Sequence, residues 1–165
     1  MKNIDLHFPE KKADRYNMLN AQMRELLKGE EDLTANLANA SALLNEALEA
    51  INWGGFYLVK NGELVLGPFQ GKVACVRIAL GKGVCGTAAL ENKTQIVDNV
   101  HQFPGHIACD SASNSELVVP IRKAGKVVGV LDIDSPEYGR FDSVDSEGLE
   151  RVVRTIEEAC DFENQ

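Results

Sequence analysis

The chain of 165 residues lacks the features that mark membrane, secreted and nucleic-acid-binding proteins. No window holds the ~20 apolar residues of a membrane span, and the N-terminal sequence has no apolar stretch long enough for a signal peptide. The 17 Lys and Arg residues are outnumbered by 25 Asp and Glu and form no basic run, so phosphate contacts to nucleic acid are not expected. We therefore expect a cytoplasmic protein that binds neither membranes nor nucleic acids.

Cysteine is scarce, with four residues, and no two of them form a C-x-x-C pair. Outside a secretory context, so few thiols are more typical of free or catalytic groups than of a disulfide framework. Cys160 falls on an apolar helical stripe, where a small buried side chain is expected. Cys75, Cys85 and Cys109 lie in strings rich in small residues, and the local sequence leaves a redox role and a buried role equally open.

A compact zinc-binding pattern is missing too. His101, His106 and Cys109 are the best candidates for metal ligands, but their spacing matches no standard zinc site. We expect no metal, and we expect the two histidines to order the surrounding loop or to tune the neighbouring thiol.

Repeats, linkers and low-complexity segments are absent as well. With 44% hydrophobic and 25% charged residues, the composition is that of a globular protein, and the length allows a sizeable core. We predict a single domain over residues 1–165.

Apolar spacing predicts helices at both ends of the chain. Helical stripes cover residues 16–27, 33–51 and 149–160. Asp142 or Ser143 can cap the last of these helices, because both side chains accept hydrogen bonds from free backbone N–H groups.

Two β-hairpins are predicted between these helices. Asn61-Gly62 and Ala124-Gly125 each separate two apolar runs, within residues 52–69 and 116–134. Pro120 requires an edge, a bulge or an end within its strand, because proline has no N–H to donate.

Each of the three distinctive cysteines is expected on a different kind of element. A strand over residues 73–80 would place Cys75 and Arg77 on one face, which favours a thiolate. Cys85 follows a glycine-flanked turn at the start of a short helix, where the helix dipole lowers a thiol pKa. Cys109 lies in a segment rich in turn-forming residues that predicts a long, functional loop.

Acidic side chains gather at the second hairpin. Asp132 and Asp134 are two residues apart near a strand end, so they point to the same side, and Glu116 opens the preceding strand. Two carboxylates this close do not both ionise cheaply, so one pKa is expected to rise. An acidic pocket and a pair solvated in a turn are equally compatible with this pattern.

Trp53 is the single tryptophan, and Gly54 and Gly55 follow it. A lone tryptophan is most often a core aromatic. Glycines beside an aromatic ring also let a backbone or a ligand come close, and Tyr57 adds a second ring on the alternating face.

Taken together, these strings resemble the free methionine-(R)-sulfoxide reductase family. The match comprises Trp53-Gly-Gly-Phe-Tyr57, the three cysteine strings, residues 110–116 and Leu131-Asp-Ile-Asp-Ser-Pro136. The resemblance implies an α+β protein with the GAF fold. In that fold, an antiparallel sheet of about six strands has the N-terminal and C-terminal helices packed on one side.

The resemblance also implies roles for the cysteines. Cys109 would be the nucleophile, Cys75 the resolving residue, and Cys85 a third thiol able to join disulfide exchange. The implied activity is reduction of free L-methionine (R)-S-oxide through a sulfenic acid and an intramolecular disulfide. No bound cofactor is implied, because thioredoxin, ultimately supplied by NADPH, would reopen the disulfide.

The acidic and aromatic residues match the substrate pocket of that family. The pocket's carboxyl groups would bind the substrate's ammonium group and donate a proton to the sulfoxide oxygen. These groups are Glu116, Asp132 and Asp134, and either task could fall to any of them. Trp53, with Tyr57 beside it, would contact the S-methyl group. Relatives of this kind are commonly homodimers.

Two other functions are compatible with the same sequence. A GAF sensor domain would bind a small ligand without catalysis, and it is disfavoured because such domains regulate an attached output domain. A thiol peroxidase is disfavoured by the acidic residues.

Overall fold

An antiparallel sheet forms the centre of the protein. The computed structural model describes residues 2–106 and 111–163, and within them six strands follow the order β3-β2-β1-β6-β5-β4. The strands are β1 (Trp53–Lys60), β2 (Glu63–Gly71), β3 (Arg77–Ala79), β4 (Gln95–Val97), β5 (Ser115–Lys123) and β6 (Lys126–Ser135). Every neighbouring pair is antiparallel, so the predicted α+β class and sheet are confirmed.

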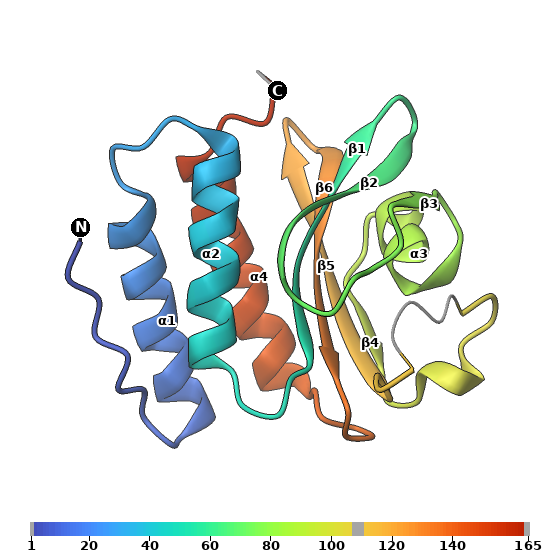
Figure 1. Ribbon diagram of the computed structural model, residues 1–165, viewed down its shortest axis with the longest axis horizontal. Helices are drawn as coiled ribbons and strands as arrows, with labels where there is room; N and C mark the ends of the chain where they lie inside the picture. The colour runs from blue at the N-terminus through green and yellow to red at the C-terminus, as the bar shows by residue number, and fades with distance from the viewer. Residues whose placement is uncertain (1, 107–110, 164–165) are drawn as a thin grey trace.

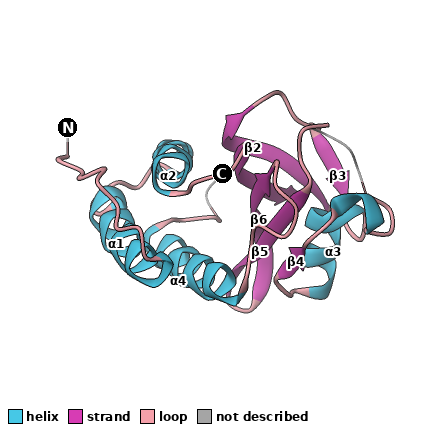
Figure 2. Ribbon diagram, turned by 90° about the horizontal axis from the view of Figure 1, so that it is seen from below, coloured by secondary structure: helices cyan, strands magenta, loops and turns pink. Residues whose placement is uncertain are grey.

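The helices lie on both faces of this sheet, as Figure 1 shows. Helices α1 (Lys12–Leu27), α2 (Leu33–Ala47) and α4 (Ser143–Ala159) share one side, where α2 packs on β1 and β2 and α4 packs on β5. Helix α3 (Gly83–Glu91) packs against β5 and β6 on the other side of the sheet, as the turned view in Figure 2 also shows. The N-terminal and C-terminal helices therefore pack together as predicted, and α3 covers the opposite face.

Alternation along the central strand β6 separates two hydrophobic cores. Leu131 and Ile133 are buried with α1, α2 and α4, whereas Val130 is buried on the α3 side. Because side chains alternate along a strand, Asp132 and Asp134 share the α3 side with Val130. This pattern brings two carboxyl groups into the smaller core.

Both predicted hairpin turns are confirmed. Asn61 and Gly62 have φ values of 52° and 81°, and Ala124 and Gly125 have 51° and 77°. A two-residue turn with positive φ at both central positions matches the twist of the flanking strands.

Pro120 lies on an edge, which is one of its three predicted placements. Strand β4 pairs only with Glu116, Leu117 and Val118 of β5, so among the described residues β5 has a free edge beyond that point. On its other side, Pro120 faces Val130 of β6. The missing N–H therefore costs no ladder hydrogen bond with β4.

The strand predicted over residues 73–80 is wrong in extent, because β3 begins only at Arg77. Val73 and Val76 are 88% and 63% exposed, so their apolar side chains mark no buried strand face. The carbonyl of Cys75 instead accepts a hydrogen bond of 2.8 Å from the Tyr57 hydroxyl. The hydrogen bond from Tyr57 therefore holds the backbone at Cys75, which belongs to no regular strand.

Two further elements differ from their predicted extents. Strand β4 was not expected, because three residues are too short to display a period. The helix predicted to reach residue 51 ends at Ala47, where Leu48 is the C-cap and its N–H binds the Leu44 carbonyl. The last helix begins as predicted, with Asp142 as its N-cap in a capping box.

No helix in the described part of the chain is long and apolar enough to cross a membrane.

Candidate active site

A pocket opens on the α3 side of the sheet, between the central strands and the start of α3. It is partly open to solvent, and aromatic and apolar side chains line it together with a few polar groups, as is usual for small-molecule sites. Strands β1, β5 and β6 contribute Trp53, Tyr57, Glu116, Asp132 and Asp134 to its lining. The structure therefore brings together every predicted substrate-binding residue.

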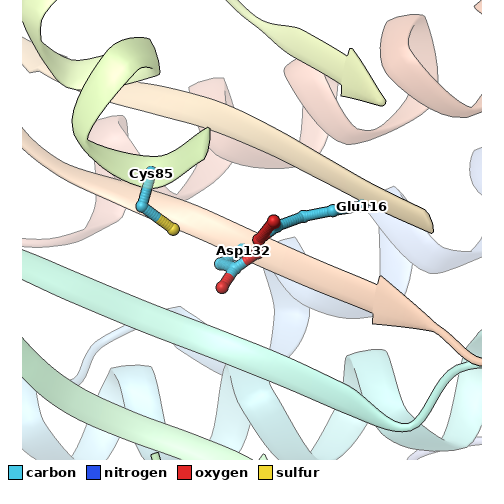
Figure 3. A group of neighbouring side chains, drawn as sticks. All are labelled: Cys85, Glu116 and Asp132. Carbon is cyan, nitrogen blue, oxygen red and sulfur yellow. The ribbon is translucent and has the colours of Figure 1, made fainter. Parts of the chain in front are cut away.

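The β5–β6 register explains how the carboxyl groups meet. Glu116 pairs with Asp134 across the ladder, and Asp132 lies two residues before Asp134 on the same face. Cys85 approaches from α3, and one ligand atom each of Cys85, Glu116 and Asp132 lies within 4.8 Å of the others (Figure 3). We call Glu116, Asp132 and Asp134 the acidic cluster.

Burial dominates the electrostatics of this cluster. Glu116 and Asp132 are only 8% and 5% exposed. Burial, followed by the nearby Asp132 and Asp134 carboxylates, raises the pKa of Glu116 well above its usual range. Burial also raises the pKa of Asp132, and contacts with Glu116 and Cys85 only partly offset that effect. The pocket therefore holds protons on carboxyl groups at pH values where a solvated carboxyl has lost them.

Cys85 lies in the first turn of α3 as predicted, but the expected lowering of its pKa is wrong. Burial, followed by the charges of Asp132 and Glu116, raises the pKa of the thiol well above its usual value. Backbone N–H groups at a helix start favour a thiolate only where the charge remains solvated or paired with a cation. Cys85 is a free thiol facing carboxyl groups instead.

Cys75 lies in the irregular segment between β2 and β3 and is disulfide-bonded. The predicted strand face shared by Cys75 and Arg77 is wrong, because β3 begins only at Arg77, and the Arg77 guanidinium donates to the Glu63 carboxylate at 2.6 Å. Arg77 thus ties β3 to the neighbouring β2. The neighbour of Cys75, Ala74, lines the pocket.

Trp53 and Tyr57 form an aromatic wall that serves both the core and the pocket. The Trp53 ring stacks on Phe69 at 5.0 Å and on Tyr57 at 5.9 Å between centroids. Trp53 Nε1 donates a hydrogen bond of 3.2 Å to the Lys72 carbonyl, which fixes the ring. The close approach at Gly55 is made by Phe69 of β2, since a Cβ on this glycine would lie 2.3 Å from the Phe69 Cβ.

The remaining predicted residues divide into three groups. Cys109, the predicted nucleophile, lies outside the described residues. Cys160 is buried in the core between the sheet and helices α1, α2 and α4, as expected. His101 Nε2 lies 2.9 Å from the Asn114 side-chain oxygen, which fits the predicted ordering of the loop.

Lys82 and Ser113 also line the pocket, and sequence reasoning missed Lys82. Ser113 accepts a hydrogen bond of 3.0 Å from the Asn52 side-chain amide, which ties the loop before β5 to the start of β1. Lys82 precedes α3 in the string GKG, and its position between two glycines was the available signal.

Comparisons with known proteins agree with this geometry. The family model described as "GAF domain" matches residues 38–161. The free methionine-R-sulfoxide reductase of Escherichia coli (strain K12) is 53% identical over 146 residues, covering 88% of each chain. A structure of fRMsr of Staphylococcus aureus, in complex with substrate, has a TM-score of 0.84 at 56% identity over 87% of this chain and 94% of that one.

A second solved relative has also been crystallised with its ligand. The free methionine-R-sulfoxide reductase from Neisseria meningitidis, in complex with its substrate, has a TM-score of 0.91 at 43% identity over 95% of both chains. The acidic pocket, the fold and these likenesses agree. The chain therefore belongs to the GAF-domain family of free methionine-R-sulfoxide reductases.

Proposed function

We propose that this protein reduces free L-methionine (R)-S-oxide to L-methionine. The observation that carries the proposal is the acidic cluster beside the Trp53 wall of a small pocket, with Glu116 and Asp132 buried. A free amino acid brings an ammonium group, which carboxylates bind, and a sulfoxide oxygen needs a proton to depart as it is reduced. The names of the relatives above support the same substrate.

The first step is attack of the Cys109 thiolate on the sulfoxide sulfur. A protonated carboxyl of the acidic cluster donates its proton to the sulfoxide oxygen. The oxygen passes to the Cys109 sulfur, so methionine leaves and a cysteine sulfenic acid remains on the enzyme. The raised pKa of Glu116 and of Asp132 supports this role, because a general acid must still hold its proton near neutral pH.

The second step closes an intramolecular disulfide. The Cys75 thiol condenses with the sulfenic acid, a sulfur–sulfur bond forms and water leaves. Cys75 is favoured over Cys85 as the resolving thiol, because the buried Cys85 has a raised pKa and a neutral thiol is a poor nucleophile. The dithiol of thioredoxin then reduces the disulfide and becomes oxidised itself.

Turnover coupled to thioredoxin tests the proposal. Thioredoxin, its reductase and NADPH are supplied, and NADPH loss is followed with each epimer of free methionine sulfoxide. We expect turnover of the R epimer and little or none with a methionine sulfoxide inside a peptide. Absence of turnover with the R epimer would refute the proposal and favour a GAF domain that binds a ligand without catalysis.

A further inference from the structure

Three potential metal ligands meet in the pocket from three separate elements. Figure 3 shows the Cys85 sulfur on α3 directed toward the carboxyl groups of Glu116 on β5 and Asp132 on β6. Their ligand atoms lie within 4.8 Å of one another, and all three residues are buried. No other group of this kind occurs in residues 2–106 and 111–163.

A second observation indicates that this group has room for a cation. Asp132 is 5% exposed, and its Oδ1 atom is buried without a hydrogen-bond partner in the structure. A buried carboxyl oxygen without a partner is costly, so this atom is open to a group that supplies positive charge, either the ammonium of the substrate or a metal ion. In the described part of the chain, no Lys or Arg forms an ion pair with Glu116 or Asp132.

We propose that Cys85, Glu116 and Asp132 bind Zn²⁺ in competition with the substrate. A thiolate and two carboxylates are ligands that zinc accepts, with bonds of about 2.0–2.3 Å in tetrahedral geometry. Such bonds place ligand atoms roughly 3–4 Å apart, so the trio needs only small side-chain movements to reach them. Mg²⁺ and Ca²⁺ prefer oxygen ligands, so the thiolate of Cys85 favours Zn²⁺ over them.

The bound ion would act as an inhibitor. It displaces the thiol proton of Cys85, forms a zinc–thiolate bond and occupies the carboxylates that bind the substrate's ammonium group. A water molecule at the fourth position can face the pocket, since three protein ligands leave one position open. Competition with substrate rests on the proposed function, whereas metal binding itself does not.

Cadmium provides a direct readout, because Cd²⁺ bound to a thiolate absorbs in the ultraviolet and occupies zinc sites. The experiment uses reduced protein carrying Cys75→Ser and Cys109→Ser, so that only Cys85 and Cys160 remain as thiols. We expect one Cd²⁺ per chain, displaced by Zn²⁺ and unaffected by excess Mg²⁺. Adding Cys85→Ala should remove the thiolate band, while adding Cys160→Ala should leave it unchanged.

The carboxylate ligands are tested in the same background. Glu116→Gln and Asp132→Asn should each weaken Cd²⁺ binding at least about tenfold, as expected for loss of a ligand. Glu91→Gln removes an exposed carboxylate from α3 and should not weaken it. If Cys85→Ala fails to fold by circular dichroism, Cys85→Ser replaces it.

Two results would overturn the proposal: absence of the band in the double variant, or a band that survives both substitutions of Cys85. Cd²⁺ binding to the double variant that is not weakened by free methionine (R)-S-oxide would overturn the competition alone. A failed reductase assay with intact Cd²⁺ binding would count against the proposed function and leave the metal site standing.

Discussion

At the residue scale, Asp132 and Asp145 show how the same side chain is used in opposite ways. Both are fully or nearly buried, at 5% and 0% exposed. Asp145 accepts hydrogen bonds from Lys12 at 2.8 Å, Arg140 at 3.2 Å and Tyr16 at 2.7 Å. Asp132 has acidic neighbours and a raised pKa. Asp145 is paired with cationic side chains, whereas Asp132 lines the pocket, where a ligand can reach it.

This contrast predicts opposite effects on stability. Asp132→Asn should raise Tm by a few degrees at neutral pH, because about 1 kcal/mol shifts a domain of this size by roughly 2–4 °C. Asp145→Asn should lower stability by about 1–3 kcal/mol, because it removes the charge that binds the partly buried Lys12 and Arg140 side chains. Thermal unfolding followed by circular dichroism measures both. A loss of stability in Asp132→Asn would contradict the argument.

The same substitution should damage catalysis. Asp132→Asn and Glu116→Gln remove the proton donor or the ammonium partner, so we expect kcat/KM to fall at least about 10²-fold. The thioredoxin-coupled assay with the R epimer measures the effect. Activity within a few-fold of wild type in both variants would show that the acidic cluster performs neither task.

The amount of methionine formed per enzyme distinguishes the nucleophile from the resolving cysteine. Cys109→Ser should abolish turnover, whereas Cys75→Ser should release about one methionine per enzyme and then stop, because only the resolving step is lost. Quantifying methionine in the presence of thioredoxin, its reductase and NADPH distinguishes the two. Full multiple turnover in Cys75→Ser would transfer the resolving role to Cys85.

At the scale of elements, α1 and α4 pack closely at Gly148. A Cβ on this glycine would lie 2.3 Å from Tyr16 Cγ, and the Tyr16 hydroxyl binds Asp145 near the start of α4. Glycine is thus required here by the neighbouring ring rather than by backbone conformation. The contact joins the N-terminal and C-terminal ends of the described chain.

Gly148→Ala should therefore destabilise the protein by roughly 1–3 kcal/mol, the usual cost of overpacking a core. The higher helix propensity of alanine, worth at most about 1 kcal/mol, offsets part of that cost. Glu147→Ala provides a control on the exposed face of the same helix and should change stability little. Urea denaturation of both variants tests this, and equal midpoints would contradict the packing argument.

At the scale of the whole molecule, stability should depend on the protonation of the acidic cluster. The folded state raises the pKa of Glu116 and Asp132 above 4.5 and 3.8, so it binds more protons than the unfolded chain over that window. The protonated carboxyls of Glu116 and Asp132 contribute fully to stability below the pKa values of the unfolded chain. That contribution is lost as pH rises through the higher pKa values of the folded state. The cluster therefore costs stability at neutral pH.

The double variant Glu116→Gln/Asp132→Asn isolates this contribution. The stability of wild type relative to the variant should decrease from mildly acidic to mildly alkaline buffer, because only wild type must ionise buried carboxyls. Tm measured for both proteins across that range gives the difference. A difference that is constant with pH would mean that neither carboxyl titrates with a raised pKa.

Much of the fold was predictable because its signals are local. The hairpins at Asn61-Gly62 and Ala124-Gly125 follow from turn chemistry, and the cap at Asp142 follows from hydrogen bonding within a few residues. Strand β4 was missed because three residues carry no period. That residues 1–165 form one domain, act in the cytoplasm and form a homodimer are predictions that stay open to test.

The sequence by itself determined which chemistry is present: the thiols, the paired aspartates two residues apart and the aromatic beside glycines. Residue spacing along one strand was enough to put Asp132 and Asp134 on a common side. Only the tertiary structure decided the pKa of these groups, because burial and neighbouring charges come from other elements. Cys85 shows the difference: its helix start suggested a thiolate, and the carboxyl groups of β5 and β6 make it a neutral thiol.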